Sequence, residues 1–120
     1  MEKDGLVLTD QGLPLKAFNL IRAESAAQIE KWGNQQHTIF EWLAILGEEV
    51  GELSKEVLES RFGDVRGATE SIEREAVQVA TLALKLAWMI RKERKARYSN
   101  LKISAPEMEI SEQEPEWREP

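Results

Sequence analysis

Four acidic side chains and one amide have the types and the spacing that divalent-cation chemistry requires. They are Glu48, Glu49, Glu52, Glu75 and Gln78. At about 100° per residue, Glu48, Glu49 and Glu52 share one arc of a helix. Carboxylate and amide oxygens are the ligands that hard cations such as Mg²⁺ prefer. If two helices bring these side chains face to face, they would form a metal site of the kind found in bundle cores, whereas the alternative is a solvated acidic stripe and a structural polar network.

Three helical segments are expected to position these side chains. Pro14 suits a first helical turn, and the segment from Pro14 to Trp32 has apolar residues at helical spacing before Gly33 ends it. The next segment opens with a capping-box pattern, in which Thr38 caps and Glu41 follows three residues later. A helix is therefore expected from Thr38 to about residue 60.

The third expected helix runs from about Thr69 to Tyr98, after a loop marked by Gly63 and Gly67. Each long helix carries one apolar seam with alternating spacings of four and three residues. The two seams are Ile39, Leu43, Leu46, Val50, Leu53 and Val57, and Ile72, Ala76, Val79, Ala83, Leu86 and Ile90. No segment shows the period-two alternation of a half-buried strand, so we expect an all-α helical bundle.

The organisation expected along the chain is an irregular arm over 1–13, one helical domain over 14–99 and an acidic, disordered tail over 100–120. Residues 105–120 hold six glutamates and one arginine, which is −5 of the net charge of −6. The remaining body is close to neutral, so direct binding of nucleic acid is not expected.

The expected helices carry more apolar surface than three helices can cover. The stretch 76–90 has only Gln78, Thr81 and Lys85 as polar side chains. A helix that is apolar nearly all round needs cover on several sides. We therefore expect a homo-oligomer, at least a dimer, in which Gly47 and Gly51 let another helix approach closely.

Composition excludes several classes of site. The chain has no cysteine, which rules out disulfides, a thiolate nucleophile and zinc–thiolate sites. Its single histidine, His37, rules out a histidine-pair metal site. No apolar run is long enough to cross a membrane and no signal peptide is visible, so a cytoplasmic protein is expected.

The spacing of the acids also carries a family resemblance. Glu49-Val-Gly-Glu52, preceded by Glu48, is followed after 22 residues by Glu75-Ala-Val-Gln78, and Lys31-Trp-Gly-Asn-Gln35 comes before both. Over about residues 14–95 the chain resembles the MazG-like all-α nucleoside triphosphate pyrophosphohydrolases. That family has E-x-x-E on one helix and E-x-x-D on the next, so Gln78 stands where the family has aspartate.

The resemblance implies a hydrolase that cleaves nucleoside triphosphates to the monophosphate and pyrophosphate, for house-cleaning of the nucleotide pool. It implies Mg²⁺, with Mn²⁺ as a substitute, held by Glu49, Glu52, Glu75 and the Gln78 oxygen. It implies a helical bundle assembled as a homodimer or homotetramer. Glu48 would be a further ligand or the general base that positions the water.

Substrate contacts are expected from Lys31, Trp32 and Lys85. Trp32 offers a stacking surface for a base, although such aromatics also serve as core. Lys85 can reach a phosphate or extend to solvent. A basic cluster over 91–97 is either a phosphate clamp or a favourable charge at the helix end. Because Gln78 is neutral, the alternative function is a non-catalytic nucleotide-binding or helical interaction module.

Overall fold

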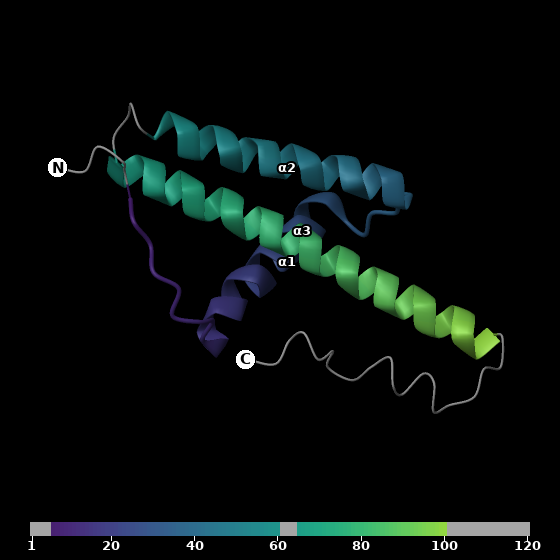
Figure 1. Ribbon diagram of the computed structural model, residues 1–120. Coiled ribbons are helices and arrows are strands. Elements are labelled where there is room, and N and C mark those ends of the chain that lie inside the picture. Colours follow the sequence, from purple (N-terminus) through teal and green to yellow (C-terminus); the bar gives the residue numbers. More distant parts are fainter. Residues whose placement is uncertain (1–5, 61–64, 101–120) are drawn as a thin grey trace. The chain divides into compact units, whose positions relative to one another are not determined.

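All regular structure in the described part of the chain is helical. The computed structural model describes residues 6–60 and 65–100, and the surroundings of side chains in 6–60 and 68–99. A 3-10 turn and three α-helices follow one another along the chain (Figure 1): Leu15–Ala17, α1 (Phe18–Trp32), α2 (Ile39–Glu59) and α3 (Val65–Asn100). The all-α expectation is thereby confirmed. None of the described helices is long and apolar enough to cross a membrane.

The chain divides by its internal contacts into two units, Met1–Leu84 and Lys85–Pro120. The first unit contains α1, α2 and the first part of α3. The described part of the second unit is the remainder of α3. Residues 6–13 have no regular secondary structure. The predicted acidic tail, apart from its first residue, lies outside the described residues.

Helix α1 ends where the sequence predicts. Gly33 has φ 73°, a backbone conformation that favours glycine because other residues bring Cβ too close to the backbone. Its N–H donates to the Ile29 carbonyl at 2.7 Å, which closes the last helical turn. The helix begins less abruptly, since the 3-10 turn at Leu15–Ala17 precedes its first α-helical residue.

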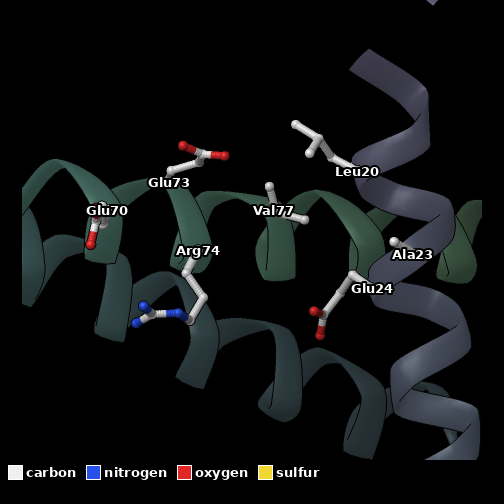
Figure 2. A pocket seen from close by; sticks show the side chains of 7 residues that line it. All are labelled: Leu20, Ala23, Glu24, Glu70, Glu73, Arg74 and Val77. Carbon is white, nitrogen blue, oxygen red and sulfur yellow. The ribbon is translucent and has the colours of Figure 1, made fainter. Parts of the chain in front are cut away.

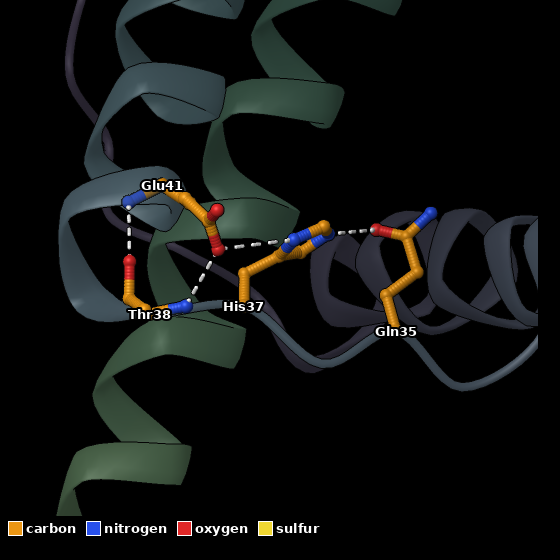
Figure 3. Close-up of polar contacts among 4 residues, drawn as sticks. All are labelled: Gln35, His37, Thr38 and Glu41. Carbon is orange, nitrogen blue, oxygen red and sulfur yellow. Dashed lines mark hydrogen bonds and ion pairs between the residues drawn. The ribbon is translucent and has the colours of Figure 1, made fainter.

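Helix α2 begins with the predicted capping box (Figure 3). The Glu41 N–H donates to Thr38 Oγ1 at 3.1 Å, and the Thr38 N–H donates to Glu41 Oε1 at 2.9 Å. His37 adds to this network: its Nδ1 lies 3.7 Å from Glu41 Oε1, and its Nε2 lies 3.2 Å from Gln35 Oε1. Its ring meets the Trp42 ring edge-on, with 4.8 Å between centroids. The single histidine therefore helps to fix the start of α2.

Helix α3 begins at Val65, ahead of the predicted Thr69, so Gly67 lies inside the helix. The prediction of a loop at Gly67 is wrong. A helical glycine costs about 1 kcal/mol relative to alanine, and extending an existing helix supplies a backbone hydrogen bond for each added residue. Gly63 lies outside the described residues.

Within the first unit, α2 and the first part of α3 run in opposite directions (Figure 1), and half-buried side chains mark the side that α2 turns inward. On α2 these include Trp42, Ile45 and Glu49, whereas the predicted seam residues Ile39, Leu43, Val50 and Val57 are exposed. The predicted seam is therefore divided, because its other two residues, Leu46 and Leu53, are half-buried. Apolar residues cover more than half of the circumference of α2, and the packing within one chain uses only part of it.

The described part of the chain has no buried apolar side chain. Its one fully buried side chain is Thr81, whose hydroxyl donates to the Val77 carbonyl at 2.7 Å within α3. The α3 seam is likewise divided, because Ile72 and Val79 are half-buried while Ala76 and Ala83 are exposed. One chain thus leaves much of its apolar surface uncovered.

Candidate functional site

Three of the predicted site residues meet where α2 faces α3. With its amide nitrogen turned toward the acids, Gln78 donates to Glu49 Oε2 at 2.8 Å and to Glu75 Oε1 at 3.1 Å. This orientation satisfies the donors of the amide and the acceptors of both carboxylates. Glu49, Glu75 and Gln78 are all half-buried. The side chains that the sequence places on two separate helices therefore form one polar junction.

The electrostatics of this junction disfavour the charged form of Glu49 and raise its pKa. Partial burial is the largest cause that raises the pKa of Glu49 above its ordinary value. The charge of Glu75 and a side-chain hydrogen bond with it raise the Glu49 pKa further. Two carboxylates in contact repel, so a shared proton or a bound cation stabilises the pair.

Glu52 and Glu48 complete the acidic group on α2. Both are exposed, and their charges add to the rise in the pKa of Glu49, with that of Glu52 the larger. Around the helix they lie to one side of Glu49, the side away from Ile39, Leu43, Val50 and Val57. The exposure of the four acids thus increases from Glu49 and Glu75, which are half-buried at the junction, to Glu48 and Glu52, which are exposed.

The oxygen atoms of these side chains are of the chemical type that a hard divalent cation prefers as ligands. Glu49 and Glu75 supply carboxylate oxygens from two helices, and Glu52 supplies another beside them. In the described residues, no group of three or more histidine, cysteine or acidic side chains is arranged as a metal-holding cluster. The Gln78 amide donates to both carboxylates in one orientation and presents its oxygen toward them in the other, the orientation that a bound cation would favour.

Of the predicted substrate-binding residues, two lie on α1 and the third lies on α3, after Gln78. Lys31 and Trp32 are at the end of α1, where Lys31 Nζ lies 4.9 Å from the centroid of the exposed Trp32 ring. Lys85 is half-buried at the start of the second unit. In that unit Arg97 Nε pairs with Glu93 Oε1 at 2.8 Å, so part of the basic cluster has an acidic partner on its own helix.

A second polar region, which sequence reasoning missed, lies between α1 and α3. A hollow of about 470 Å³ opens there (Figure 2), lined by Leu20, Ala23, Glu24, Glu70, Glu73, Arg74 and Val77. Arg74, which lines this hollow, lies one helical turn before Gln78 on α3. No signal in one sequence could have found this hollow, because its residues share no motif and come from helices far apart in the chain.

Comparison of the chain with family models, with curated proteins and with solved structures gives no match.

Proposed function

We propose that the protein is a Mg²⁺-dependent hydrolase that converts nucleoside triphosphates to nucleoside monophosphates and pyrophosphate in the house-cleaning of nucleotide pools. The observation that supports the proposal is the junction of Glu49, Glu75 and Gln78. It joins the two acidic motifs by which the sequence resembles the MazG-like family. The exposed Glu48 and Glu52 extend the same group toward solvent, from which a nucleotide would arrive.

The roles proposed for the acids follow from their positions. Glu49, Glu52 and Glu75 would hold the cation, with Gln78 contributing its oxygen after the amide turns over. Bound Mg²⁺ would neutralise phosphate charge and lower the pKa of a coordinated water. Glu48, at the exposed margin, would accept a proton from the attacking water. Mn²⁺ would substitute for Mg²⁺ because it accepts the same oxygen ligands.

The same proposal includes the residues that would contact the nucleotide and the assembly of the chain. Trp32 would stack on the base, and Lys31 and Lys85 would contact phosphates. The chain would act as a homodimer or homotetramer, because one chain leaves much of its apolar surface uncovered. Arg74 is an additional cation on the side of α3 that carries Gln78, and it would neutralise phosphate charge.

A second candidate function is nucleotide binding without turnover, or a helical interaction module. The observation that favours it is that the neutral Gln78 donates to both carboxylates, as a structural residue would. The change Gln78→Asp separates the two functions. A marked rise in pyrophosphate release would show a weakened catalytic site, whereas unchanged nucleotide binding with no release would favour the non-catalytic candidate.

The first experiment incubates the full chain with ribo- and deoxyribonucleoside triphosphates in Mg²⁺ or Mn²⁺ and measures monophosphate, pyrophosphate and orthophosphate. We expect monophosphate and pyrophosphate in equal amounts. Orthophosphate in place of pyrophosphate would contradict cleavage between the α- and β-phosphates. Absence of every product with both metals would contradict the hydrolase proposal.

Matched variants attribute the activity to the junction. Glu75→Gln and Glu49→Gln are expected to reduce turnover by at least about 100-fold, because each removes a charged ligand. The control is Glu59→Gln, the same change at an exposed residue near the end of α2. Equal activity of Glu75→Gln and Glu59→Gln would show that the junction is not the active site.

A further inference from the structure

We propose that one face of the α2–α3 hairpin is the surface on which a second copy of this chain docks. We call it the apolar hairpin face. It consists of Ile39, Leu43, Val50 and Val57 of α2 and Ala76 and Ala83 of α3. The inference concerns the assembly that the proposed function expects, but it rests on burial and helix geometry and uses neither metal nor nucleotide.

The α2 part of this face is defined by exposure. Ile39, Leu43, Val50 and Val57 are 51%, 61%, 43% and 44% exposed. All four lie roughly 80° to 120° around α2 from Glu49, which faces α3. They form one continuous stripe over most of the helix, rather than apolar residues scattered singly. A contiguous apolar stripe of this kind is typical of an interaction surface.

The α3 part lies on the same side of the hairpin. Ala76 and Ala83 are exposed and lie roughly 80° to 100° around α3 from Glu75, in the same rotational sense. In two antiparallel right-handed helices, equal rotations from the line of contact point to the same side of the pair. The stripe on α2 and the two alanines on α3 therefore form a single surface. Because alanine side chains are small, the α3 half of this surface protrudes less than the α2 half.

Charge separates this face from the opposite side of the hairpin. None of its six residues is ionisable, whereas Glu48 and Glu52 lie on the other side, with Gln78. Most of the net charge of −6 lies in residues 105–120, and the apolar hairpin face itself is uncharged, so charge repulsion does not oppose the docking of two copies there. Docking at this face leaves the acidic group open to solvent.

The uncovered apolar surface of one chain favours a partner that is available wherever the chain is made. The described part of one chain has half-buried apolar side chains but none that is fully buried, so burial of apolar surface, the main favourable term in small domains, is incomplete. Obligate homodimers often have no stable folded monomer, and a chain that covers its apolar surface incompletely fits that behaviour. A second copy is available wherever the chain is made, and a two-fold dimer is the commonest closed assembly.

The size of the face agrees with a dimer interface. A helix as long as α2 spans about 30 Å, and two packed helices are about 20 Å across, which gives a footprint of roughly 600 Å² before surface relief is counted. A standard interface buries about 800 Å² per partner. Gly47 borders the face, and a Cβ built on it would meet nothing within 4 Å of its own chain. The close approach of another helix that the sequence predicts at Gly47 is therefore absent within one chain, and a helix of a second copy could make it.

The experiment uses the absence of native cysteine. Val50→Cys places a thiol on the apolar hairpin face, and Ala44→Cys places one on an exposed part of α2 outside it. Each full-length variant is sedimented and then alkylated without metal or nucleotide. We expect a dimer or larger oligomer, in which the thiol from Val50→Cys reacts at least about tenfold more slowly than that from Ala44→Cys.

Two outcomes would overturn the inference. One is a folded monomer, helical by circular dichroism at micromolar concentration. The other is an oligomer in which both thiols react equally fast, because a different surface would then hold it together. Val50→Glu and Ala44→Glu provide a second comparison: the first should dissociate or unfold the chain while the second stays assembled. Retention of the assembly and helicity in Val50→Glu would also contradict the proposal.

Discussion

At the junction of α2 and α3, the Gln78 amide lies within hydrogen-bond distance of two carboxyl groups that repel each other when both are charged. Its nitrogen donates to Glu49 and Glu75, so the side chain that reduces the acidity of the site also stabilises the metal-free protein. A carboxylate at position 78 would reverse both effects. It would remove the two N–H donors of the amide and add a third acidic group to the half-buried junction.

Gln78→Glu, which preserves shape, tests this at the residue scale. We expect the free energy of unfolding in a chelating buffer to fall by about 1–3 kcal/mol, because two acceptors lose their donor and repulsion rises. The Mg²⁺-induced rise in melting temperature should increase, since the added charge favours a cation. Urea denaturation and thermal melting measure the two effects. Gln36→Glu, in the exposed connection before α2, is the control, and equal effects of both variants would contradict the prediction.

The raised pKa of Glu49 predicts how stability depends on pH. The folded state holds the Glu49 proton more tightly than the unfolded chain, because burial and the neighbouring Glu75 disfavour its charge. The stabilisation is therefore fully present below the ordinary glutamate pKa, and it is lost as pH rises through the higher pKa of the folded state. In chelating buffer, the wild type should lose more free energy of unfolding than Glu49→Gln between about pH 4 and pH 7. Parallel curves would show that Glu49 is not the group responsible.

At the scale of the helix, local signals set where α2 begins. Thr38 and Glu41 satisfy each other's backbone N–H groups, as the sequence pattern predicts. Gly33 likewise ends α1 through its positive φ. Such boundaries depend on residues close together in the chain, so one sequence is enough to predict them. The start of α3 differs, because Gly67 is compatible with either a loop or a helix.

Thr38→Ala is expected to lower the free energy of unfolding by about 1 kcal/mol, because the Glu41 N–H loses its acceptor. Chemical denaturation measures the loss. Thr38→Ser keeps the hydroxyl and serves as the control. A cost as large for Thr38→Ser as for Thr38→Ala would show that the methyl group, rather than the cap, carries the effect.

Which side of α2 faces inward could not be predicted from one sequence. The seam through Val50 and the side with Trp42 and Ile45 are both apolar, and periodicity alone does not rank them. The structure turns Glu49 inward and leaves Val50 exposed. The convergence of Glu49, Glu75 and Gln78 was predictable as a possibility from spacing, since each lies among apolar neighbours. The donor role of the Gln78 nitrogen depends on contacts between helices that spacing does not specify.

At the scale of the whole molecule, a cation held by both helices should raise the stability of the fold. A ligand that binds only the folded state at 100 times its Kd adds about 2.7 kcal/mol. We therefore expect saturating Mg²⁺ to raise the melting temperature of the wild type. The combined change Glu49→Gln and Glu75→Gln should remove that shift, and Glu59→Gln should keep it. An equal shift in all three proteins would indicate cation binding elsewhere.

The lack of a buried apolar side chain in the described part of the chain also has a calorimetric consequence. The heat-capacity change of unfolding follows the apolar surface that becomes exposed, and globular proteins average about 12–15 cal/mol/K per residue. A lone chain would already expose much of that surface before it melts. Its heat-capacity change would be small, its enthalpy nearly constant with temperature and its thermal transition broad. Only a species that covers the apolar surface would show the curved stability profile of an ordinary globular protein.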